Sequence, residues 1–261
     1  MTVSFIEGQF LMNRPLDIKN IASARYRAPA TALLICSGEP PSRTLARKLA
    51  RLSDLIVAAD GGANSARALG IRPEVIVGDL DSVTPATRRY FASSLFVHVS
   101  RQDNTDFEKA LDFLKKGSVR DVIVVGAVGR RIDFTLANLS LLWRYVSRFH
   151  LTVVGDGWRA IPARRVNRIV SPRGTTVSLI PFGRVNGITL GGLRYPLRDG
   201  TLNKGQVAVS NVVIRSPFSV KVRSGSLLII VQDSLLPSRQ DPASPPTTGR
   251  RPAGRSSKRE V

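Results

Sequence analysis

The feature that most constrains the fold is an alternation of short apolar runs with amphipathic stretches between residues 31 and 154. The apolar runs are four to seven residues long, and several are nearly continuous in Val, Ile and Leu. Strands that are buried on both faces of a parallel sheet have this composition. The runs that we interpret as strands are TALLIC, DLIVAA, EVIV, LFVHV, DVIVVGA and LTVV.

Several stretches between these runs have helical spacing. Leucines at i, i+4 and i+7 mark one helix over residues 45–52. A second helix is predicted to begin at a capping box formed by Thr105 and Glu108, and it ends at Gly117. A third is predicted over residues 136–146, where apolar side chains recur on one face. Strands that alternate with helices indicate an open, doubly wound sheet.

The character of the sequence changes after Gly155. Residues 159–232 have no helical period, and they contain many short β-type runs separated by Gly and Pro turns. We therefore expect an α/β fold in which a doubly wound, mostly parallel, Rossmann-like sheet is followed by an all-β sandwich or barrel domain. The predicted ranges are 31–155 for the α/β domain and 156–232 for the β domain.

The two termini are set apart from these domains. Residues 1–30 form a predicted N-terminal extension, and residues 233–261 are rich in Pro, Ser, Gly and Arg. Such a segment cannot bury enough apolar surface to offset its ordering entropy, so we expect a disordered basic tail. The tail carries +3 of the net charge of +20, so residues 1–232 carry +17. This charge is typical of proteins that bind nucleic acid, an anionic membrane or a small polyanion such as a nucleotide.

Composition and motifs exclude several classes of protein. The single cysteine, Cys36, excludes intramolecular disulfides and a cysteine-based structural zinc site. No apolar run approaches the roughly 18 residues of a membrane span, and the N-terminus is a poor signal peptide. We therefore expect a cytoplasmic protein that does not engage a membrane. The sequence lacks GxxxxGK[ST], GxGxxG and GxSxG, which disfavours a P-loop NTPase, a standard NAD enzyme and a serine hydrolase.

Acidic residues and glycines follow four successive predicted strands. The carboxyl ends of parallel strands meet at one edge of a sheet, and ligands of such sheets bind there. The chain has only 19 acidic residues, so their gathering at one edge indicates a functional site. The four segments are DGGAN (60–64), GDLDS (78–82), RQDNTD (101–106) and VGRRID (128–133).

The residue types in these segments favour binding of phosphates with a divalent cation. Asp79, Asp81 and Asp106 would repel one another unless a cation lay among them, and oxygen ligands alone suit Mg²⁺. Glycines at 61 and 62 would let the backbone approach phosphates, and Arg131 would pair with their charge. The simpler interpretation of any single Asp here is a helix N-cap, and Asp-Gly and Gly-Gly are turn signals by themselves.

Taken in order, these segments resemble the motifs of the thiamine pyrophosphokinase family. The resemblance rests on DGGAN (60–64), GDLDS (78–82), QDNTDFEKAL (102–111) and GAVGRRIDFTLAN (126–138). The segment GLRYPL (192–197) and the pair Ser210 and Asn211 look like signatures of that family's second domain. The match covers about residues 31–232.

The resemblance implies a Mg²⁺-dependent thiamine diphosphokinase, which transfers pyrophosphate from ATP to thiamine and releases AMP. It also implies a homodimer whose active sites lie between the α/β domain of one subunit and the β domain of the other. The implied metal ligands are Asp79, Asp81 and Asp106, and the implied catalytic residues are these three with Arg131 and Asp133. The family holds nucleotide and phosphates at the positions of Asp60, Gly61, Gly62, Asn64, Gln102 and Thr105, and thiamine at those of Ser210 and Asn211.

Two departures from the family pattern concern one loop. Arg130 stands where the family commonly has a second glycine, and Phe134 stands where it commonly has histidine. Two alternative functions are also open. One is a pyrophosphokinase of the same fold that acts on another alcohol. The other is a basic nucleic-acid-binding protein, which the low aromatic content of 6% and the absence of a known binding motif disfavour.

Overall fold

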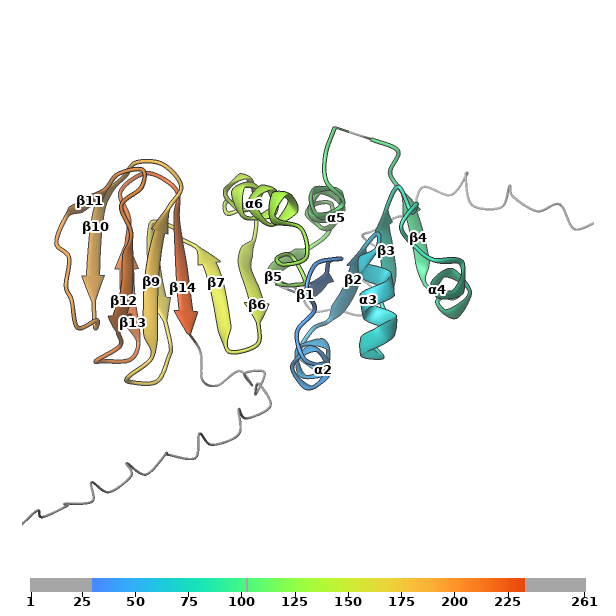
Figure 1. The fold of residues 1–261 in the computed structure, drawn as a ribbon, viewed down its shortest axis with the longest axis horizontal. Coiled ribbons are helices and arrows are strands. Elements are labelled where there is room, and N and C mark those ends of the chain that lie inside the picture. The colour runs from blue at the N-terminus through green and yellow to red at the C-terminus, as the bar shows by residue number, and fades with distance from the viewer. Residues whose placement is uncertain (1–29, 102, 233–261) are drawn as a thin grey trace, which may run out of the picture.

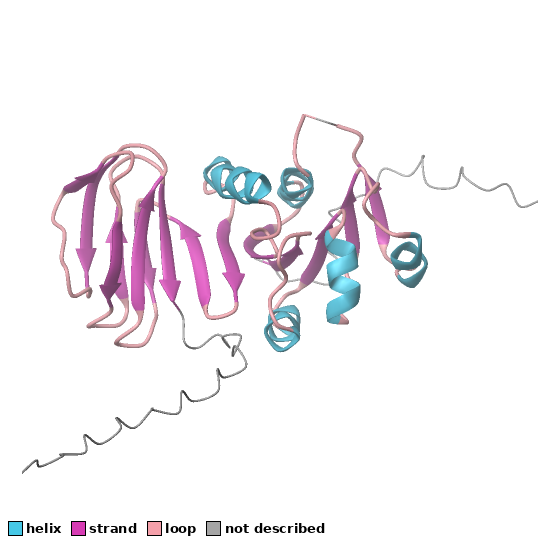
Figure 2. Ribbon diagram, in the orientation of Figure 1, coloured by secondary structure: helices cyan, strands magenta, loops and turns pink. Residues whose placement is uncertain are grey.

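The computed structural model describes residues 30–101 and 103–232, which form two sheets and the helices that pack on them (Figures 1 and 2). The larger sheet has ten strands, and six of them are parallel in the order β6-β5-β1-β2-β3-β4. These six strands are β1 (Ala30–Ile35), β2 (Leu55–Ala59), β3 (Val75–Gly78), β4 (Leu95–His98), β5 (Val119–Val125) and β6 (His150–Gly155).

Helices cover both faces of the parallel strands, as expected of a doubly wound sheet. The residues of β1 alternate between two cores: Leu34 packs with α5 on one face, and Leu33 packs with α2 and α3 on the other. The helices are α2 (Arg43–Arg51), α3 (Gly62–Leu69), α4 (Pro85–Tyr90), α5 (Asp106–Lys115) and α6 (Ile132–Leu141), followed by the 3₁₀ helix η1 (Leu142–Arg144).

Local sequence signals explain where three of these helices begin. The side chains of Ser42, Thr84 and Thr105 each accept a hydrogen bond from a backbone N–H in the first turn of α2, α4 and α5. The helix predicted over residues 136–146 differs from the structure, because α6 ends at Leu141 and the chain tightens into η1. This tighter turn lets Leu142 and Tyr145 both enter the core beneath α5.

The second half of the described chain is all β. Four of its strands extend the large sheet in the antiparallel order β7-β14-β9-β12, and the other four form a second sheet ordered β11-β10-β13-β8. The two sheets enclose an apolar core of their own. The strands are β7 (Trp158–Pro162), β8 (Val166–Ile169), β9 (Thr176–Pro181), β10 (Val185–Gly191), β11 (Gly200–Leu202), β12 (Ala208–Val212), β13 (Phe218–Lys221) and β14 (Leu227–Gln232).

The predicted fold class is confirmed, and the structure adds how the two halves are joined. β6 is parallel to β5 on one side and pairs with β7 in an antiparallel hairpin on the other. One sheet therefore runs through both halves, and the boundary predicted at residue 155 falls at the turn of this hairpin. Among the described helices, none is long and apolar enough to cross a membrane. The predicted tail and all but the last residue of the predicted N-terminal extension lie outside the described residues.

Candidate active site

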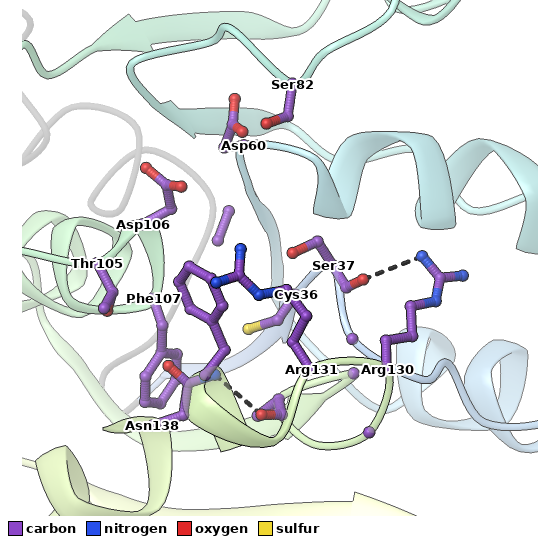
Figure 3. Close-up of a pocket in the computed structure, with 16 residues that line it drawn as sticks. Cys36, Ser37, Asp60, Ser82, Thr105, Asp106, Phe107, Arg130, Arg131 and Asn138 are labelled. Atoms are coloured by element: carbon purple, nitrogen blue, oxygen red, sulfur yellow. Dashed lines mark hydrogen bonds between the residues drawn. The ribbon is translucent and has the colours of Figure 1, made fainter. Parts of the chain in front are cut away.

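A pocket of about 300 Å³ opens at the carboxyl ends of the central parallel strands (Figure 3). Segments that follow β1, β2, β3 and β5 line it, together with the first turns of α5 and α6. The carboxylates of Asp60 and Asp106 lie along one side, and Arg131 extends its guanidinium toward them from the α6 side. The predicted sheet edge is thus the place where the acidic and basic side chains meet.

Three aspartates at this edge form a compact group. Asp60 follows β2, and Asp79 and Asp81 follow β3; one carboxylate oxygen of each lies within 4.8 Å of the others. Asp60 is 2% exposed, and its Oδ1 has no hydrogen-bond partner among the described residues. Burial raises the pKa of Asp60, although hydrogen bonds from Ser82 and Gly61 oppose that shift. An unpartnered buried carboxylate oxygen beside two other carboxylates is a fitting donor set for a hard divalent cation.

The backbone around these aspartates is shaped to bring them together. Asp60 and Leu80 have φ angles of 41° and 68°, in the left-handed region that few non-glycine residues adopt. A Cβ at Gly78 would lie 2.6 Å from the Cβ of Asp60, so only glycine permits this approach. Strained residues of this kind gather at functional sites.

Lys109 is a functional candidate that the sequence reasoning missed. Its ammonium donates to Asp79 Oδ2 at 2.8 Å and to Asp106 Oδ1 at 2.9 Å, and its side chain is 2% exposed. The hydrogen bond from Lys109 lowers the pKa of Asp79. The structure therefore places Asp106 beside the group of three, joined to it through an ammonium. The signal in the sequence is the i, i+3 spacing of Asp106 and Lys109, which puts both on one face of α5.

The loop between β5 and α6 supplies the basic wall of the pocket. Arg130 has a φ of 58°, and its guanidinium donates to the carbonyl of Ser37 at 3.1 Å. An arginine thus occupies a left-handed backbone conformation, which glycine adopts without strain. The guanidinium of Arg131 lies 4.3 Å from the ring centroid of Phe134, so the residue that replaces histidine supplies a cation–π contact.

Arg131 is also paired with Asp133, through hydrogen bonds from Nε and a terminal nitrogen to the two carboxylate oxygens. This pairing lowers the pKa of Asp133. Both side chains are exposed, and Arg131 lines the pocket whereas Asp133 does not. Thr105 lines the pocket while it caps α5. Gln102 lies outside the described residues.

Three of the predicted nucleotide-binding residues have roles in positioning the loops. Asn64 donates to the carbonyl of Ser82 at 2.7 Å and accepts from the backbone and hydroxyl of Thr84, so it fixes the loop that carries Asp79 and Asp81. Gly61 is buried at the N-cap of α3. A Cβ at Gly62 would lie 2.1 Å from the carbonyl oxygen of Ile35, so glycine is needed there to seat α3 against β1.

Ser210 and Asn211 lie on β12, at the far end of the ten-stranded sheet from the acidic group (Figure 1). Ser210 is exposed and has a φ of 59°. Asn211 is buried; its side chain donates to the carbonyl of Tyr195 and accepts from the backbone N–H of Tyr195 and Val212. Asn211 therefore holds the exposed Tyr195 loop against β12, and the described chain does not bring these two residues to the pocket.

Comparison with known proteins follows the same division of the chain. Residues 46–154 match the model of the thiamin pyrophosphokinase catalytic domain, and residues 165–227 match that of the thiamin pyrophosphokinase vitamin B1 binding domain. Together the two models cover well over half of the chain.

Individual relatives and solved structures agree with these matches. A thiamine pyrophosphokinase from Bacillus subtilis is 28% identical over 67% of this chain and 86% of its own length. One from Oryza sativa is 27% identical over 82% of this chain and 97% of its own length. A crystal structure of the Bacillus subtilis enzyme superposes with a TM-score of 0.68 at 26% identity, and covers 78% of this chain and 99% of that one. The chain belongs to the thiamine pyrophosphokinase family.

Proposed function

We propose that this protein transfers the pyrophosphoryl group of ATP to the hydroxyl group of thiamine in a Mg²⁺-dependent reaction. The hydroxyl oxygen forms a bond to the β-phosphorus, and the bond from that phosphorus to the oxygen bridging the α-phosphate breaks, which releases AMP. The observation that carries this proposal is the group of Asp60, Asp79 and Asp81 in a chain of this family, with Asp60 lining a pocket that Arg131 lines from the opposite side.

Asp60, Asp79 and Asp81 would hold the Mg²⁺. The support is the unpartnered buried oxygen of Asp60 and the closeness of one oxygen from each residue. A bound Mg²⁺ supplies neutralisation of phosphate charge during the transfer. Asp106 would contact the reacting groups from beside this cluster, since Lys109 holds only its Oδ1 and leaves Oδ2 for another partner.

The basic wall would bind the phosphates of ATP. Arg131 reaches into the pocket and offers a planar, permanently charged group for phosphate oxygens, once its exposed pairing with Asp133 is exchanged. The first turn of α5 lines the same pocket, and the free backbone N–H groups of a helix N-terminus attract anions. Transfer of this kind depends mainly on position and electrostatics.

The proton of the thiamine hydroxyl needs an acceptor, and Asp106 is better placed for this than Asp133. Asp106 lines the pocket, whereas Asp133 lies outside it. Lys109 also holds Asp106 in place beside the metal-binding group, whereas the Asp133 side chain is exposed. Asp106 is the proposed acceptor.

Thiamine would be held by the β half of a second copy of the chain. Eight strand steps separate β12 from β3 in the sheet order, which is about 38 Å along the sheet at the usual strand spacing. No thiamine molecule can bridge that length within one chain. A homodimer that sets Ser210 of one subunit against the pocket of the other would complete the site. The unpaired, buried Cys36 suits the reducing cytoplasm, where we place the protein.

The proposal is tested by incubating the purified protein with ATP, Mg²⁺ and thiamine, and separating the products by liquid chromatography. We expect thiamine diphosphate and AMP in equal amounts, and neither product when EDTA replaces Mg²⁺. Pyrimidine and pterin alcohols in place of thiamine test for another acceptor. AMP release that is greater with one of these alcohols would assign a different substrate, and ADP in place of AMP would contradict transfer of a pyrophosphoryl group.

A further inference from the structure

Lys109 occupies a position that the reaction described above does not explain. It lies on α5, among residues that otherwise pack into the core, and it is the one ammonium that contacts the acidic group among the described residues. Burying a lysine is costly unless its charge is paired. The Lys109 ammonium forms two ion pairs, one with Asp79 in the loop after β3 and one with Asp106 on its own helix.

The charge balance around Lys109 is uneven. Four carboxylates gather at this sheet edge, namely those of Asp60, Asp79, Asp81 and Asp106, and Lys109 is bonded to two of them. Arg131, which lines the pocket, is paired with Asp133 instead. The ammonium therefore supplies the positive charge that keeps Asp79 and Asp106 close together. Asp60, whose Oδ1 is unpartnered, has a carboxylate oxygen within 4.8 Å of one from Asp79.

We infer that Lys109 is a positioning residue that serves as a built-in counter-cation of the acidic site. It holds Asp79 and Asp106 in one arrangement when no metal is bound, and its charge weakens the hold of Asp60, Asp79 and Asp81 on a divalent ion. This inference rests on the proposed metal role of those three aspartates. A residue with a purely structural role would have the opposite effect, since its removal would disorder the ligands and weaken metal binding.

The inference predicts a characteristic behaviour of Lys109→Met, which keeps the length of the side chain and removes its charge. Mn²⁺ should bind to this variant at least about tenfold more tightly than to the wild type, because a positive charge 2.8 Å from a ligand carboxylate has been removed. In EDTA the variant should melt several degrees lower than the wild type, because Asp79 and Asp106 repel each other without a counter-ion. Mn²⁺ should recover most of that loss.

The experiment measures Mn²⁺ affinity by electron paramagnetic resonance, without ATP or thiamine, and melting temperature with and without Mn²⁺. Lys109→Arg keeps the positive charge beside Asp79, so its Mn²⁺ affinity should stay within about threefold of that of the wild type. Lys115→Met makes the same change at an exposed position of the same helix and controls for net charge. Weaker or unchanged Mn²⁺ binding in Lys109→Met would overturn the inference.

Two further outcomes are decisive. If Lys109→Met unfolds in EDTA and Mn²⁺ restores its structure, the inference is supported; if Mn²⁺ does not restore it, the role of Lys109 is structural and the inference fails. Production of AMP and thiamine diphosphate by the wild type is measured separately. If the wild type makes both products but Lys109→Met does not bind Mn²⁺ more tightly, only this inference fails. If the wild type makes neither product, the proposed function fails.

Discussion

Asp60 shows how a single residue can serve a site at the expense of stability. Its carboxylate is buried, one oxygen is unpartnered among the described residues, and its backbone is in the left-handed region. Each of these features costs free energy in the metal-free protein. A bound divalent cation would offset the electrostatic part of that cost.

Asp60→Asn should therefore stabilise the metal-free protein while it impairs the reaction. The amide has nearly the same shape and carries no charge to desolvate, so we expect a gain of about 1 kcal/mol, or roughly 2–4 °C in Tm. Turnover should fall at least ~100-fold, as for the loss of other electrostatic elements of phosphoryl transfer. Thermal melts in EDTA and AMP release check both expectations, and a variant that is less stable yet active would show that Asp60 serves the fold.

The pH dependence of this stabilisation has a definite sign. The folded-state pKa of Asp60 is raised, so its contribution to stability is fully present below the unfolded pKa of about 3.9 and is lost as pH rises through the folded pKa. Asparagine does not titrate. The stability advantage of Asp60→Asn should thus grow as pH rises from about 4 toward neutrality, which urea unfolding of both proteins over that range will measure. An advantage that is constant with pH would contradict the raised pKa.

Arg130 allows a test of backbone strain. At a φ of 58°, any side chain with a Cβ is strained by about 1 kcal/mol, whereas glycine is not. Arg130→Gly and Arg130→Ala both remove the hydrogen bond to Ser37, so they differ mainly in this strain. We expect the glycine variant to be about 1 kcal/mol more stable than the alanine variant in urea unfolding. Equal stability would mean that the loop relaxes to another conformation.

At the scale of elements, α6 is unusual because apolar side chains lie on its exposed side. Ile132 is 73% exposed and Leu136 is 56% exposed, at i and i+4 on the helix, with Phe134 beside them. A helix that is apolar on both faces is normally covered on both. In the proposed homodimer, the second subunit would cover this side, next to the pocket that α6 helps to line.

The double variant Ile132→Lys/Leu136→Lys should separate assembly from folding. Neither side chain belongs to the apolar cores of its own chain, so the melting transition should remain cooperative. We expect the mass measured by light scattering to fall from that of a dimer to that of a monomer, with a large loss of thiamine-dependent AMP release. A variant that remains dimeric would place the interface elsewhere. Lys115→Glu and Lys116→Glu, on the exposed end of α5, provide a surface control.

For the whole molecule, the ten-stranded sheet both joins the two halves and separates their functional residues. It fixes Asn211 and the acidic group at positions about 38 Å apart along its width. A rigid sheet of this kind cannot fold back on itself to close a site. Asn211 and the acidic group would therefore meet only across two copies of the chain, as in the proposed homodimer.

Mixing two inactive variants tests this arrangement. Asp81→Asn impairs the acidic group, and Asn211→Ala releases the Tyr195 loop of the β half. In a heterodimer, one of the two sites would combine an intact acidic group with an intact β half. Random exchange should therefore restore activity to about a quarter of all sites. Confirmed exchange by mass spectrometry with no recovery of activity would place each site within one chain.

The sequence alone determined the class of fold and the edge of the sheet that carries the chemistry. Strands that are buried in a parallel sheet have nearly continuous runs of Val, Ile and Leu. Because the strands are parallel, the residues that follow them lie at one edge of the sheet. The starts of three helices also depend on local sequence, because a capping side chain accepts a hydrogen bond from a backbone N–H a few residues away. These caps are Ser42, Thr84 and Thr105. The end of α6 at Leu141 is different, since no residue there breaks a helix and the turn depends on packing beneath α5.

Only the tertiary structure decided which side chains act together. Asp106 and Lys109 are neighbours on one helix, but the hydrogen bond from Lys109 to Asp79 joins residues thirty positions apart and depends on the depth at which α5 packs on β3. The grouping of Asp60 with Asp79 and Asp81 depends on close approach of two loops at Gly78. Local sequence patterns predict which face of a helix or strand is buried and where the element ends. The distances between the carboxylates, and the position of the ammonium that balances their charge, depend on how the elements pack.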